Sequence, residues 1–113
     1  MKVSFNGWKE HVATFETAAA LEAGSVVKIS GNGAVSACGD GDKFAGAVVS
    51  QRGDFAAVQL RGYAELPFTG TAPAVGFQTL CADGSGGVKT GSAGRELLVT
   101  YVNAGEKTVG LIL

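Results

Sequence analysis

The fold is decided by a stretch that the chain carries twice. Residues 23–37 read AGSVVKISGNGAVSA, and residues 75–90 read VGFQTLCADGSGGVKT. In both copies a short run rich in β-formers is followed by a glycine turn and a second short run, which predicts a β-hairpin. An apolar run follows each hairpin, at residues 44–49 and 97–102. The sequence therefore predicts one hairpin plus a following strand, built twice.

The spacing of the copies gives the size of the unit. Gly76 follows Gly24 by 52 residues, and Val99 follows Val48 by 51. We take residues 23–60 and 74–103 as pseudo-repeats within a single β domain over residues 23–113. The 18 glycines divide the chain into short segments. This favours an all-β fold, a small β-barrel or sandwich built from two related hairpin units.

Strands and turns can be placed along most of the chain. The run at residues 97–102 is almost entirely apolar, so we expect this strand to be covered on both faces. Only residues 18–23 look helical, so at most one short helix is predicted, ended by Gly24. Strands are expected at residues 3–5, 26–30, 34–37, 46–50, 56–60, 63–66, 78–81, 87–89, 96–103 and 107–113.

Two segments lie outside the predicted repeats. Residues 1–22 hold Phe5, Trp8 and Phe15, and they are expected to form either an edge strand or an arm that packs on a neighbour. Aromatic side chains dominate many interfaces, so these three are candidate partner-binding residues. Phe68 is a fourth candidate, because two prolines bracket residues 68–72 and indicate an exposed loop.

Composition narrows the classes of partner. A chain of 113 residues is one domain, with 46% hydrophobic and only 17% charged residues, against a usual charged share of about 25%. The apolar surplus indicates burial against another subunit or partner. A net charge of −1 with no basic stripe argues against nucleic-acid binding. The sequence has neither a run of eighteen apolar residues nor a secretory signal, so we expect no membrane and a cytoplasmic site of synthesis.

The two cysteines, Cys38 and Cys81, each precede a Gly/Asp turn at what we take to be corresponding points of the two copies. We favour two small buried hydrophobic side chains. A disulfide between the copies is the alternative, and sequence alone does not supply the geometry it needs. No CxxC occurs and His11 is the sole histidine, so no metal or other cofactor is expected.

A search for catalytic motifs favours a protein that is not an enzyme. His11 lies alone in the N-terminal segment, without a nucleophile nearby in sequence. Asp40 and Asp42 could begin a calcium loop, but no bidentate Glu follows. With Asp83 they are better explained as turn-forming residues that bond their own backbone. Residues 84–90 have the wrong glycine spacing for a phosphate loop.

The order of segments resembles the core of small tailed-phage capsid decoration proteins, also called head-stabilising proteins. Residues 23–27 match an AG-x-x-V strand, and residues 41–49 match a GD-x-F-x-G-V turn and strand. Residues 57–66 follow in the style of the family's V-x-V-x-G strand. The resemblance covers residues 21–102.

This resemblance implies a mechanical function with no catalytic residue. Such proteins sit on the outer surface of expanded capsids, often as trimers, and clamp neighbouring capsid subunits. For this chain it implies the major capsid protein as partner, a homotrimer, and a place on the virion after synthesis in the bacterial cytoplasm. A phage tail or baseplate component, or a small host-surface binding module, is the alternative function.

Overall fold

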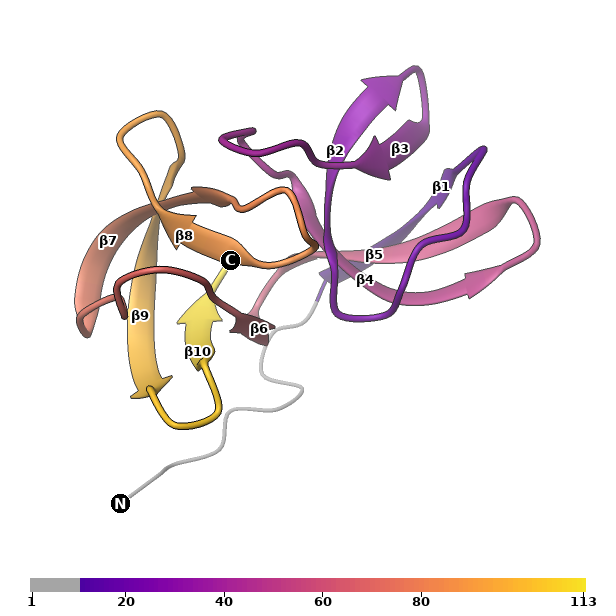
Figure 1. Ribbon diagram of the computed structural model, residues 1–113. Coiled ribbons are helices and arrows are strands. Elements are labelled where there is room, and N and C mark those ends of the chain that lie inside the picture. The colour runs from indigo at the N-terminus through magenta and orange to yellow at the C-terminus, as the bar shows by residue number, and fades with distance from the viewer. Residues whose placement is uncertain (1–10) are drawn as a thin grey trace.

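The computed structural model describes residues 11–113 and contains ten β-strands, with no helix in that range (Figure 1). The predicted all-β fold is confirmed. The strands are β1 (His11–Glu16), β2 (Val26–Gly31), β3 (Ala34–Ala37), β4 (Gly46–Arg52), β5 (Phe55–Arg61), β6 (Tyr63–Pro67), β7 (Gly76–Ala82), β8 (Val88–Thr90), β9 (Arg95–Asn103) and β10 (Thr108–Ile112).

The strands predicted between residues 26 and 113 are all present, with ends that differ by at most two residues. The strand predicted at residues 3–5 lies outside the described residues. The helix predicted at residues 18–23 is wrong. Instead of a helical bond, the Leu21 amide donates to Oε1 of Gln51 at 2.7 Å. A segment this short cannot offset the cost of helix nucleation, so the contact with β4 determines its conformation.

The first five strands form a closed barrel in the order β1-β3-β2-β4-β5. Strand β1 pairs antiparallel with β5 and closes the barrel by a parallel pairing with β3 at Glu16 and Ala34. Of the two alternatives for the N-terminal segment, residues 11–16 are thus a strand of the domain. The N-terminal segment therefore does not lie wholly outside the β domain.

The last five strands form a sheet that repeats this order. Read as β6-β10-β9-β7-β8, it matches β1-β5-β4-β2-β3 strand for strand. A parallel bridge between Phe68 and Val88 corresponds to the parallel contact between β1 and β3. In Figure 1 the two sets of strands lie side by side, β1–β5 in indigo to pink and β6–β10 in brown to yellow.

The register of the strands confirms that the halves correspond. In β4 the pairing with β5 shifts between Val48 and Ser50. In β9 the pairing with β10 passes from Val99 to Tyr101, so one residue bulges at the same point. We call β1–β5 the first repeat and β6–β10 the second repeat. Each unit is longer than the sequence indicated, because β1 corresponds to β6.

The predicted hairpin turns are present where glycine supplies a left-handed backbone. Gly33 has φ 67° between β2 and β3, and Gly53 has φ 59° between β4 and β5. Asp83 also acts as predicted, since its Oδ1 accepts hydrogen bonds from the amides of Ser85 and Gly87. These turns hold the strand ends in register.

Two clusters of buried side chains form the core. The smaller one fills the first barrel and contains Val27, Val35, Val48, Ala56 and Val58, with Phe15, Leu21 and Leu60 packed against it. The larger one joins the repeats, so we call it the shared core. Its members are Val26, Cys38, Phe44, Ala47, Ala64, Leu66, Phe68, Leu80, Ala82, Val88, Leu97, Val99, Val109 and Leu111.

A loop of the first repeat joins the two repeats, and it is longer than the equivalent loop of the second repeat. Residues 38–45, the long loop, connect β3 to β4, whereas residues 91–94, the short loop, make the equivalent connection from β8 to β9. The long loop lies along β7. The Gly41 amide donates to the Ala82 carbonyl at 2.8 Å, and the Ala82 amide donates to the Asp42 carbonyl at 2.8 Å. Phe44 from this loop is buried in the shared core.

Candidate functional site

The residues predicted to bind partners are placed very differently. Phe5 and Trp8 lie outside the described residues. Phe15 is half-buried on β1, against the core of the first barrel. Phe68 is only 3% exposed and belongs to the shared core, so its prediction as an exposed contact is wrong. It directly follows β6 and bridges Val88, and this turns its ring inward. Residues 69–72 beyond it are exposed.

The two cysteines are free and buried, as small hydrophobic side chains. The expectation that they occupy corresponding points is wrong, because Cys38 follows β3 whereas Cys81 lies in β7, the equivalent of β2. Burial raises the pKa of the Cys38 thiol to about 11. A thiol with so high a pKa is a poor nucleophile near neutral pH.

Among the acidic residues, Asp40 and Asp83 join the two repeats, whereas Asp42 bonds within the first repeat. Asp40 and Asp83 are not equivalent positions, as the sequence suggested, but neighbours that pair as an isolated bridge. Asp40 forms an ion pair with Lys89 of β8. Asp42 accepts from Lys28 at 2.8 Å and from the Gly39 amide. The bond from Lys28 and that from the amide lower the pKa of the Asp42 carboxyl.

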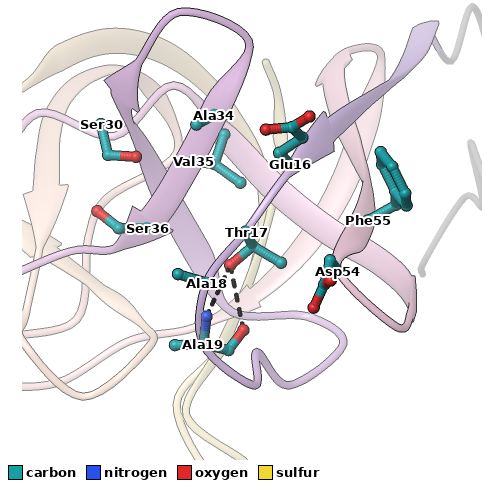
Figure 2. A pocket seen from close by; sticks show the side chains of 10 residues that line it. All are labelled: Glu16, Thr17, Ala18, Ala19, Ser30, Ala34, Val35, Ser36, Asp54 and Phe55. Carbon is teal, nitrogen blue, oxygen red and sulfur yellow. Dashed lines mark hydrogen bonds between the residues drawn. The ribbon is translucent and has the colours of Figure 1, made fainter.

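A cavity with a volume of about 650 Å³ opens at one end of the first barrel (Figure 2). We call it the barrel mouth. Its walls carry two carboxylates and three hydroxyls, with small apolar side chains between them, and no histidine or cysteine. The lining residues are Glu16, Thr17, Ala18, Ala19, Ser30, Ala34, Val35, Ser36, Asp54 and Phe55.

A smaller depression beside the long loop is basic. Lys28, Lys43 and Arg95 line it together with Asp42 and Ile29. Arg95 donates to the Ala45 carbonyl at 3.1 Å, and its guanidinium lies 5.5 Å from the centre of the Phe44 ring. Burial lowers the pKa of Arg95. These contacts hold the base of the long loop, so the arginine serves the joint between the repeats.

Exposed apolar side chains are the most prominent feature of the surface. Three come from adjacent strands of the first barrel, Val12 at 48%, Val49 at 45% and Phe55 at 53% exposure, and we call them the barrel face. Two more are Cα partners across β7 and β9, Phe77 at 70% and Leu98 at 37% exposure. Large apolar side chains grouped on neighbouring strands mark contact surfaces.

The exposed pair on β7 and β9 was not predicted from the sequence, and its Leu98 contradicts the expectation for the strand at residues 97–102. Residues 97–102 were expected to be covered on both faces, yet Leu98 is open on the outer one. The signal was present in the sequence. Phe77 follows the alternation of β7 opposite to the inward-facing Leu80, and Leu98 lies between the buried Leu97 and Val99.

A metal centre would need several ligating side chains close together within residues 11–113. No three His, Cys, Asp or Glu side chains gather there as metal ligands would. The same residues include no helix of the length and apolarity that crossing a membrane requires. His11 lies exposed on β1. The exposed apolar side chains on the strands are the candidate contact sites that the described residues offer.

No protein-family model matches the chain, and no curated protein matches it. The sequence resemblance and the exposed surfaces of the strands are therefore the grounds for a function.

Proposed function

We propose that this protein is a structural component of a phage virion that binds the outer surface of the capsid and stabilises it. Its partner is the major capsid protein, and it has no catalytic role. The observation that carries the proposal is the exposure of large apolar side chains on strands of a firmly joined pair of repeats. A body of this kind works by contact surfaces, as a clamp between capsid subunits must.

The residues behind the resemblance support the proposal by their positions. Residues 23–27 lead into β2, and residues 41–49 run from the long loop into β4. Both segments contribute to the joint between the repeats, through Val26 and Phe44 in the shared core. The matching motifs thus belong to the rigid body of the protein. We expect the capsid contacts to lie on the surfaces around it.

We assign the capsid contact to the barrel face. Val12, Val49 and Phe55 come from β1, β4 and β5, three neighbouring strands of one closed barrel. Side chains on paired strands are held in fixed relative positions, so little freedom is lost on binding. Many copies bound to one capsid also act together, so each contact can be weak.

The test is cosedimentation of the purified protein with expanded and unexpanded capsids of the phage that encodes it. We expect binding to expanded capsids and its loss in the double variant Val12→Ser, Phe55→Ser. Ala104→Ser, in the exposed turn between β9 and β10, is the matched control and should bind normally. A wild-type protein that binds neither capsid form would refute the proposal.

A deletion tests the N-terminal segment separately. It should end at residue 10, because removing residues 11–16 would take away a strand of the barrel. Loss of capsid binding by this deletion, with the fold intact by circular dichroism, would place Phe5 and Trp8 in the contact. Unchanged binding would restrict the contact to the described residues.

A further inference from the structure

The first repeat has an outer row of side chains that the second repeat covers. Val26, Ala47 and Gln59 are successive Cα partners across β2, β4 and β5, and they are 1%, 4% and 7% exposed. The Val26 amide donates to the Gly86 carbonyl at 3.0 Å. Gln59 Nε2 donates to the Tyr63 carbonyl at 2.8 Å. The row is therefore buried by contacts with the other half of the chain.

The second repeat has the same row, and there two of its three side chains are exposed and the third, Ile112, is half-buried. Phe77, Leu98 and Ile112 are successive Cα partners across β7, β9 and β10. Leu98 lies two residues before the bulged residue of β9, just as Ala47 lies two residues before the bulged residue of β4. Phe77 is 70% and Leu98 is 37% exposed. We call these three residues the open row.

The surface that receives the covered row belongs to one end of the second repeat. Residues 22–25 line a crevice there with Glu65, Pro67, Ser85 and Gly86. Val26 shares its core cluster with Phe68, Val88 and Ala82 of the same end. The end of β6, the loop between β7 and β8, and the start of β8 thus form a seat for the first repeat.

The barrel mouth of the first repeat is the surface that corresponds to this seat. The Thr17 amide donates to the backbone carbonyl of Asp54 at 2.9 Å, and the Phe68 amide donates to the backbone carbonyl of Lys107 at 3.0 Å. These bonds match, so Thr17 corresponds to Phe68. Figure 2 shows Thr17 in the wall of the mouth, with Ala34 and Val35 across from it. In the second repeat this seat is filled by Val26 and Phe44, whereas in the first repeat it is an open cavity of about 650 Å³.

We propose that the open row of one copy docks in the barrel mouth of a second copy. The contact repeats between molecules the interface that already joins the two repeats within the chain. Phe77 supplies the aromatic anchor, and Ala18, Ala34 and Val35 supply a small-residue wall for it. Because the two surfaces differ, the contact is heterologous, and successive copies form a closed ring or a filament.

This inference rests on the proposed function and on the homo-oligomer that the sequence resemblance implies, and it names the surfaces that would join the copies. Both surfaces belong to this chain, so its test needs no capsid. The barrel face assigned to the capsid contact includes Phe55, which also lines the rim of the mouth. A Phe55 variant would affect both capsid binding and self-association. The variants below leave Phe55 unchanged, so the two properties can be tested separately.

The experiment is sedimentation equilibrium of the purified protein over a wide concentration range. The wild type is expected to assemble beyond a monomer. The row variant Phe77→Ser, Leu98→Ser and the mouth variant Ala18→Arg should each weaken assembly at least about 30-fold, as loss of an interface anchor does. Phe77, Leu98 and Ala18 are exposed, so each variant keeps its fold, which near-ultraviolet circular dichroism verifies.

Ala104→Ser is the matched control, since Ala104 is exposed in the turn between β9 and β10 and lies outside the open row, the barrel mouth and the barrel face. It should assemble as the wild type does. A wild type that stays monomeric at all concentrations, or a row variant or a mouth variant that assembles normally, would overturn the proposal. If assembly fails but capsid binding persists, only the proposed function survives.

Discussion

The two repeats share their strand order, their bulge and their closing bridge, yet they differ in what surrounds them. In the first repeat the outer row is covered and the mouth is open. In the second repeat the outer row is open and the mouth is filled. Duplication alone explains the common body. The difference arises because a single chain contains one contact between its repeats. The first repeat contributes its outer row to that contact, and the second repeat contributes its mouth.

Loop length is what makes the joint possible. The long loop has eight residues, 38–45, and the short loop has four, 91–94. The additional residues let the first repeat reach β7, bond to Ala82 on both sides and insert Phe44. The short loop has no aromatic residue to insert. The aromatic side chain of the open row in the second repeat is Phe77, which lies on β7 and is exposed.

The largest expected effect tests whether Phe44 and Phe77 differ as their burial implies. Phe44→Ala should lower the free energy of unfolding by about 3–5 kcal/mol, because a buried ring is replaced by a cavity. Phe77→Ala should change it by less than about 0.5 kcal/mol in the monomer, since this ring is exposed. Urea unfolding of both variants at low protein concentration makes the comparison. Equal effects would mean that the long loop does not join the repeats.

A smaller effect tests how tightly the short loop is built. A Cβ at Gly94 would overlap the carbonyl of Leu80, so Gly94→Ala should destabilise the protein by roughly 1–3 kcal/mol through overpacking. Gly105→Ala is the control, because a Cβ there would meet nothing closer than 3.4 Å. Urea midpoints measured in parallel separate the two. A tolerated Gly94→Ala would show that the short loop has room to lengthen.

The smallest effect concerns Cys38 in the long loop. Burial raises its pKa from 9.0 to about 11, so its contribution to stability is full below pH 9 and is lost as pH rises towards 11. In a Cys81→Ala background, modification of native Cys38 at pH 9 should be roughly 50-fold slower than in the unfolded chain on thiolate fraction alone. Stopped-flow thiol titration measures both rates. Equal rates would show the long loop to be open to solvent.

Sequence reasoning located the hairpins because glycine turns and β-rich runs are local signals. It left residues 1–22 open between an edge strand and an arm, since β5, the partner strand of β1, is about 40 residues away. It misplaced Phe68 because a proline-bracketed segment reads as exposed until its bridge to Val88 is known. The open row was missed for a similar reason, because covering of both faces of residues 97–102 was assumed from composition. Each miss depends on a long-range contact.

The most direct test of the central claim is the mass of an equimolar mixture of the row variant and the mouth variant. The first keeps an intact mouth and the second keeps an intact open row, so each alone should be a monomer. Sedimentation equilibrium of the mixture is expected to give a heterodimer of one copy of each, and nothing larger. A mixture that remains monomeric, or that restores the wild-type assembly, would contradict the head-to-tail contact.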